Sequence, residues 1–140
     1  MLLHLIVRGK IGKSPEAELV DRYLARIPWP TKVTELPDRG GTVPPSDGKA
    51  VTVVLDEKGK ALASTDFAAK LDAWRDQGRR EVRFLIGAAD GHDEAQRREA
   101  DLLLSFGPAT WPHMMARAML AEQLYRAISI LQNHPYHRDG

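Results

Sequence analysis

The chain has 140 residues, 43% of them hydrophobic and 28% charged, which is typical of a soluble globular protein with one core. We therefore expect residues 1–140 to form a single domain. The 20 basic and 19 acidic residues nearly balance, so a surface for nucleic acid must be a local patch or be completed by a second subunit. The absence of cysteine excludes disulfides and thiolate metal sites, and it fits a reducing cytoplasm.

The amino-terminal segment predicts a strand followed by a helix. Leu2–Val7 is a compact apolar run that is too short to span a membrane and lacks the features of a signal sequence. Ser14 supplies a capping hydroxyl and Pro15 suits the first helical position, while Pro28 ends the helix. One face of this helix is expected to hold the apolar side chains of Leu19, Val20, Tyr23, Leu24 and Ile27.

Strands and helices alternate through the rest of the chain. Residues 37–49, with three prolines and three glycines, predict a loop, and residues 56–60 predict a charged turn. The alternation predicts an α/β domain with a mostly parallel sheet. Strands are expected over 32–36, 50–55, 81–86 and 102–106. One helix is expected to be capped by Thr65 or Asp66 and ended by Gly78, and two more are expected over 93–100 and 112–132.

The carboxyl ends of three predicted strands are followed by candidate ligand-binding loops. In parallel sheets ligands bind beyond these ends, which places the loops after Leu55, Ile86 and Phe106 together. Gly87 and Gly91 bracket the second loop, but their spacing does not match the dinucleotide motif G-x-G-x-x-G. The chain also has no phosphate-binding P-loop, so a nicotinamide-dependent enzyme is not favoured.

The last predicted helix, residues 112–132, has an apolar face at positions 121, 124, 128 and 131. Methionines near its start suit either the core or a dimer interface. Glu122 and Arg126 have the i, i+4 spacing of an ion pair. Arg117 has no acid at this spacing, so it is either solvated or available to a phosphate group.

A short polar tail follows this helix and contains His134, Tyr136, His137 and Arg138. Proton carriers, donors and an aromatic ring suit a site that binds an anionic aromatic ligand, and nucleic acid is the obvious candidate. The two histidines have H-x-x-H spacing. No metal is expected there, because zinc needs three or four ligands and no cysteine is present.

A long, ordered set of motifs matches a known family. The motifs are Leu55-Asp56 with Gly59-Lys60, Ile86-Gly87, Trp111-Pro112-His113, Arg117 and the stretches 121–127 and 133–138. In these motifs the chain resembles the bacterial large-subunit (23S) ribosomal RNA pseudouridine N3-methyltransferases, which are the RlmH or YbeA family of the SPOUT superfamily. The similarity runs from the first strand to the tail.

The resemblance implies a mostly parallel sheet flanked by helices, with a trefoil knot near the carboxyl end. Such knots are rare exceptions among protein folds. It also implies a homodimer, with S-adenosyl-L-methionine as cofactor and no membrane or metal partner. Carried over by position, the cofactor-binding residues would be Leu55, Gly87, Phe106, Gly107, Pro108, Ala109, Thr110 and Trp111, which lie in the three strand-end loops chosen above.

The implied reaction is transfer of a methyl group to N3 of a pseudouridine in ribosomal RNA. Because N3 carries a proton in the neutral base, that proton must leave. We expect His137 to act as base or orienter, with Tyr136 and Arg138 holding the substrate, and His113 is the rival base. The sequence does not choose between the two histidines.

The predicted RNA contacts are Arg117, Arg8 and Lys10, assigned to phosphate groups. The near-neutral net charge favours the assembled ribosome over naked RNA as substrate. A ribosome- or RNA-binding protein of SPOUT fold with impaired catalysis is the alternative, because the Gly87–Gly91 loop lacks a glycine and a proline of the family pattern. A SPOUT enzyme for transfer RNA is disfavoured, since no appended RNA-binding domain is expected.

Overall fold

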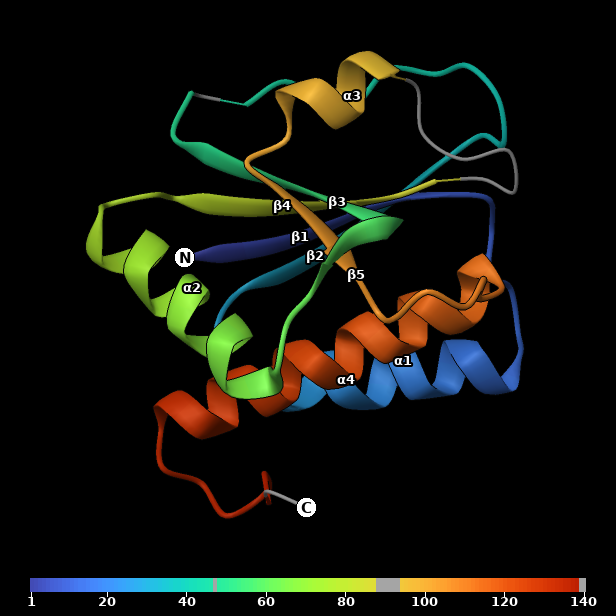
Figure 1. Ribbon diagram of the computed structural model, residues 1–140. Coiled ribbons are helices and arrows are strands. Elements are labelled where there is room, and N and C mark those ends of the chain that lie inside the picture. Colours follow the sequence, from blue (N-terminus) through green and yellow to red (C-terminus); the bar gives the residue numbers. More distant parts are fainter. Residues whose placement is uncertain (47, 88–93, 139–140) are drawn as a thin grey trace.

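The computed structural model describes residues 1–46, 48–87 and 94–138, and the predicted alternation of strands and helices is confirmed within them (Figure 1). The strands form an α/β fold with helices on both sides of a sheet. The elements are β1 (Leu2–Arg8), α1 (Pro15–Arg26), β2 (Thr31–Leu36), β3 (Ala50–Ala61), α2 (Ser64–Asp76), β4 (Glu81–Ile86), α3 (Glu94–Glu99), β5 (Leu102–Ser105) and α4 (His113–Leu131).

The five strands form one parallel sheet in the order β2-β1-β4-β3-β5. Helices α1, α2 and α4 cover one face, and the short α3 lies on the other (Figure 1). Alternate residues of β1, β3, β4 and β5, such as Leu3 and Leu5 of β1, enter the main core between the sheet and the three helices. Helix α4 packs against both α1 and α2, so it is the central element of the helical layer.

Helix starts show how far local signals determine the boundaries. The Ser14 hydroxyl accepts a hydrogen bond from the backbone N–H of Ala17 at 3.1 Å, as the capping sequence predicts. Helix α2 begins two or three residues earlier than predicted, with Ala63 in the capping position and no side-chain cap. On the predicted apolar face of α1, Val20 is buried, whereas Leu19 is 36% exposed.

The predicted charged turn at 56–60 lies within β3, which corrects the sequence-based boundary. Strand β5 pairs with β3 on both sides of a register shift, because Leu104 lies opposite both Leu55 and Lys60. The backbone of Gly59 is pressed against β5. A Cβ atom at this position would lie 2.5 Å from the Leu103 carbonyl oxygen. Glycine is therefore required for the close approach of the two strands.

We expect Gly59→Ala to lower the free energy of unfolding by about 3 kcal/mol, because the backbone of β5 has to move to admit the methyl group. Denaturant unfolding of the variant measures this loss. Gly12→Ala is the control, since a Cβ there meets nothing within 4 Å and only backbone strain opposes it. Equal losses for the two variants would contradict the close-packing argument.

Parts of two predictions fall on residues 88–93, outside the described residues. These are the interior of the Gly87–Gly91 loop and the start of the predicted helix at 93. The trefoil knot near the carboxyl end, which the family resemblance implies, stays a prediction. Among the described helices, none combines the length and apolarity that a membrane crossing requires.

Candidate active site

A cavity of about 700 Å³ opens at the edge of the sheet where β4 and β5 end and where β3 passes residues 55–58. Its walls include the apolar side chains of Leu55, Ile86 and Phe106. The structure brings the three predicted loops together here, as expected for the carboxyl edge of a parallel sheet. All the predicted cofactor residues except Pro108 line the cavity, namely Leu55, Gly87, Phe106, Gly107, Ala109, Thr110 and Trp111.

Hydrogen bonds to Ser105, Glu57 and Phe106 hold the loop between β5 and α4. The buried Ser105 hydroxyl accepts a hydrogen bond from the Gly107 backbone N–H at 3.0 Å. The Thr110 hydroxyl donates to the carboxylate of Glu57 at 2.8 Å, and the Trp111 indole N–H donates to the Phe106 carbonyl at 3.3 Å. These bonds hold the loop in shape while the Trp111 ring remains 42% exposed at the rim.

Charged residues at the cavity mouth were not predicted as site residues. Asp56 forms a 2.8 Å ion pair with Arg97 of α3, and its other oxygen accepts the backbone N–H of Lys58 at 2.8 Å. Glu57, which holds Thr110, lies beside it in the lining. Their place directly after the apolar run 50–55 was the available signal, because residues that follow such a run reach the ligand edge of the sheet.

His113 lies at the first turn of α4 and lines the cavity, as does Ala116 one turn later. The turn after β1 and the loop after β2 meet it there. A Cβ atom at Gly9 would lie 2.9 Å from Asp38 Oδ1 and 3.9 Å from His113 Nε2. Of the two candidate bases, His113 is therefore the one at the cavity of its own chain.

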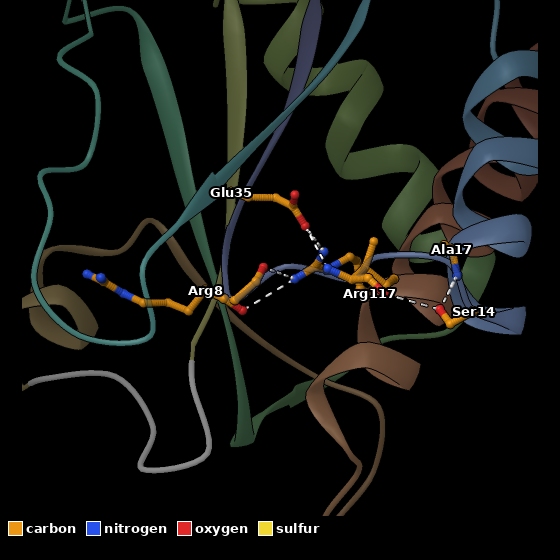
Figure 2. Close-up of polar contacts among 7 residues, drawn as sticks. Arg8, Ser14, Ala17, Glu35 and Arg117 are labelled. Carbon is orange, nitrogen blue, oxygen red and sulfur yellow. Dashed lines mark hydrogen bonds and ion pairs between the residues drawn. The ribbon is translucent and has the colours of Figure 1, made fainter.

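Arg117 does not lie where a phosphate contact requires, so its predicted role is corrected. Its side chain is only 1% exposed, although α4 starts at the surface. Figure 2 shows the guanidinium group pointing at Glu35 and at the backbone of Arg8. It donates to Glu35 at 2.9 Å and to the backbone carbonyls of Arg8 and Gly9 at 3.3 and 3.1 Å. The same Glu35 oxygen accepts the Ile11 backbone N–H at 2.9 Å, so Arg117 joins α4 to β2 and to the turn after β1.

The other two predicted RNA residues have different surroundings. The Arg8 side chain points away from Arg117 and donates to the carbonyl oxygens of Pro37 and Gly40, so it holds the loop after β2 (Figure 2). Lys10 is exposed on the turn after β1. Of the three predicted phosphate contacts, Lys10 is the one whose side chain is open to solvent.

The tail turns back at the end of α4 through a left-handed residue. Asn133 has φ +56°, and the backbone N–H groups of Asn133 and His134 donate to the carbonyls of Ile130 and Ser129. This pattern is the Schellman motif, in which asparagine replaces the more common glycine. The motif reverses the chain, so the tail runs back beneath the last turns of α4 (Figure 1).

Three α4 residues, Glu122, Tyr125 and Arg126, hold the returning tail. Arg126 pairs with Glu122 at 2.6 Å, which confirms the predicted i, i+4 ion pair. The Tyr136 hydroxyl donates to Glu122 at 3.1 Å, and its ring lies 4.8 Å from the Arg126 guanidinium carbon. Arg126 Nη1 lies 3.1 Å from His137 Nδ1. The Tyr125 ring packs against Tyr136 edge-to-face at 4.6 Å.

Burial, hydrogen bonding with Tyr23 and the charge of Glu122 together raise the pKa of Tyr136 well above its ordinary value. The phenol therefore keeps its proton at neutral pH and serves as a donor. Burial lowers the pKa of Arg126, but the hydrogen bond and charge of Glu122 outweigh it, so the Arg126 pKa is raised. The Tyr136 phenol is therefore neutral and the Arg126 guanidinium is positively charged at neutral pH.

The cavity and the tail lie at opposite ends of α4. The helix has 19 residues and is about 28 Å long. The tail reaches back to Glu122, which leaves roughly 14 Å along the axis to His113. The predicted catalytic residues are thus not brought together in one chain. His113 is at the cavity, while Tyr136, His137 and the exposed Arg138 are at the far end.

Comparisons with known proteins agree with this architecture. The family model described as "Predicted SPOUT methyltransferase" matches residues 1–137. The chain belongs to the SPOUT methyltransferase family. A solved structure titled as a probable methylase family protein from Haemophilus influenzae has the same fold as this SPOUT methyltransferase. Its TM-score is 0.62 at 10% identity, over 98% of this chain and 70% of that chain.

Curated relatives of this SPOUT methyltransferase share its full length. The chain is 71% identical to a protein from Rhizorhabdus wittichii and 72% identical to one from Novosphingobium aromaticivorans, in both cases over 100% of each chain. It is 45% identical to a protein from Rhodospirillum centenum over 99% of each chain. All three are named ribosomal RNA large subunit methyltransferase H.

Proposed function

We propose that this chain transfers the methyl group of S-adenosyl-L-methionine to N3 of a pseudouridine in large-subunit ribosomal RNA, within the cytoplasm and on the assembled ribosome. The single observation that supports it best is the full-length similarity to relatives named for ribosomal RNA methylation. Its strand-end cavity supplies a place for the cofactor. The pseudouridine and the ribosome rest on the family resemblance.

The residues of the cavity fit S-adenosyl-L-methionine. A volume of about 700 Å³ is in the range of small-molecule sites. Leu55, Ile86 and Phe106 offer apolar walls to the adenine, and the carboxylates of Asp56 and Glu57 suit a ligand that carries a sulfonium and an ammonium charge. When bound, the cofactor supplies an electrophilic methyl group, so the protein mainly positions the reactants and excludes water.

The site is proposed to form between two copies of the chain. If the tail acts on the substrate, it must do so at a cavity that its own chain does not bring near. In a homodimer, the tail of one subunit lies at the cavity of the other, which supplies Tyr136, His137 and Arg138 beside His113. Lys10, on the turn after β1, is a candidate contact to RNA phosphate.

Cofactor binding is tested through Gly107, whose φ of +107° suits glycine and strains other residues. We expect Gly107→Ala to weaken S-adenosyl-L-methionine binding about tenfold in calorimetry, because the loop must rearrange. Gly78→Ala is the matched control. It has φ +77° and equally open surroundings, but it lies at the end of α2, away from the cavity. We expect it to lose stability without losing affinity.

The activity is tested on ribosomes from a strain that lacks the gene. Incubation with the purified protein and cofactor should add one methyl group to one pseudouridine, which mass mapping of the ribosomal RNA locates. Methylation of naked RNA alone would contradict the proposed substrate form. Absence of both methylation and cofactor heat would favour the alternative, a ribosome-binding protein that has lost catalysis.

A further inference from the structure

The contact between Arg126 and His137 determines where the imidazole carries its proton. Arg126 Nη1 lies 3.1 Å from His137 Nδ1. A guanidinium group has only donors, so the histidine nitrogen must accept this hydrogen bond. A ring nitrogen that accepts carries no proton, and the neutral ring then carries its proton on Nε2. In this arrangement His137 presents an N–H group on the side of the ring away from Arg126.

Arg126 is itself held in place by Glu122. Its Nε and Nη2 atoms lie 2.8 and 2.6 Å from the same Glu122 oxygen, which leaves Nη1 directed at the tail. The Tyr136 hydroxyl donates to this oxygen as well, and the Tyr136 ring lies over the guanidinium group. The tail is therefore docked by one ion pair that contacts two consecutive residues. This arrangement leaves little freedom in the orientation of His137.

We propose that Glu122 and Arg126 are positioning residues that hold His137 as the Nε2–H tautomer, so that His137 donates a hydrogen bond to the substrate base and does not remove its proton. The inference rests on the proposed function, in which the tail meets the pseudouridine. It assigns one of the two roles that the sequence left open, and it assigns the other role to His113.

The chemistry of the base explains why a donor is useful. N3 lies between two carbonyl groups, and loss of its proton places negative charge on their oxygens. An N–H donor aimed at one of these oxygens stabilises that charge. The N3 proton passes to His113, at the cavity. The bond from N3 to the methyl carbon then forms as the methyl–sulfur bond breaks, and the electron pair of that bond remains on sulfur.

Substitution by glutamine separates a donor from a base. The side-chain amide of glutamine can donate near the position of Nε2, but it cannot accept a proton at neutral pH. We expect His137→Gln to keep single-turnover methyl transfer within about tenfold of the natural chain, and His137→Ala to lose about a hundredfold. At His113 the glutamine and alanine variants should lose rate equally. Equal losses at His137 would overturn the donor role.

Nitrogen NMR of the full-length protein labelled with ¹⁵N-histidine reports the tautomer without any activity measurement. We expect an unprotonated Nδ1 and a protonated Nε2 for His137 at neutral pH. Arg126→Met should release the tail and allow both tautomers, and it should lower kcat while cofactor affinity is unchanged. Arg126→Lys should restore part of kcat. A protonated Nδ1 in the natural chain would overturn the proposal.

The positioning role of Glu122 and Arg126 and the proposed function of the tail can be disproved separately. If the NMR spectrum shows the expected tautomer but deletion of 134–140 leaves methyl transfer intact, the donor role is overturned and the tail is only a structural element. If the tail is essential and Nδ1 is protonated, the proposed function stands and the positioning role of Glu122 and Arg126 falls.

Discussion

Two variants that are each inactive should regain methyl transfer when they are combined in one dimer. The first lacks residues 134–140, and the second carries Gly107→Val, a β-branched residue at a φ of +107°. Each homodimer should lose at least about a hundredfold in rate, the first for want of a tail and the second for want of cofactor. Co-expression with two affinity tags isolates the mixed dimer, and methylation of ribosomes is measured.

The expected recovery follows from counting sites. If the tail acts on the partner's cavity, a mixed dimer contains one intact site and one site that lacks both parts. The isolated mixed dimer should therefore reach about half of the natural activity. The unfractionated pool should reach about a quarter, because random assembly makes half of the dimers mixed. If each tail serves its own cavity, both sites of a mixed dimer are defective and no activity returns.

A double variant provides the matched control, because it reverses the expectation. A chain that carries both changes is combined with the natural chain. With exchange of tails between subunits, the mixed dimer is inactive, and the pool retains about a quarter of full activity from natural homodimers. With tails acting within one chain, about half is retained. The proposed composite site requires that activity returns in the first experiment and that only about a quarter is retained in the second.

Removal of the Glu35 carboxylate should be among the most destabilising changes in the chain. Glu35 is the carboxylate that faces the buried Arg117 guanidinium, whose Nε has no hydrogen-bond partner among the described residues. Glu35→Ala leaves this charge buried and facing only carbonyl groups. We expect a loss of about 3 kcal/mol in the free energy of unfolding, which corresponds to a fall of about 10 °C in Tm. Thermal and denaturant unfolding both measure it.

A double-mutant cycle separates the charge effect from lost packing. In an Arg117→Met background no buried charge remains, so the same change at position 35 should cost less than about 1 kcal/mol. Asp72→Ala, on the exposed side of α2, is the surface control and should be within about 0.5 kcal/mol of the natural chain. A full loss in the Arg117→Met background would show that Glu35 acts without Arg117.

Local signals account for the parts of the structure that were predicted well. The cap at Ser14 and the apolar runs of β1 and β4 depend on neighbouring residues, so the sequence reveals them directly. The cavity was predicted because the carboxyl ends of parallel strands meet at one edge. The expectation of a parallel sheet was therefore enough to place the loops after Leu55, Ile86 and Phe106 at one site, without knowledge of three-dimensional contacts.

Contacts between distant residues account for what the sequence did not reveal. The absence of a helical partner made Arg117 look available to phosphate, but its partner Glu35 is 82 positions away. The length of β3 depends on its second pairing with β5, which no local pattern of charges indicates. The tail contacts combine one local signal, the Glu122–Arg126 spacing, with a chain reversal at Asn133 that the sequence analysis did not identify.

The length of helix α4 sets the distance between two parts of each chain: His113 at the cavity, and the residues that hold the tail. His113 lies at the start of this helix, Glu122 lies at its middle and Arg126 lies closer to its other end. Inserting one residue between His113 and Glu122 would rotate Glu122 and Arg126 by about 100° around the helix axis and shift them by about 1.5 Å. The tail of each subunit would then miss the cavity of its partner. Insertions and deletions should therefore be tolerated better outside α4, such as in the loop between β2 and β3.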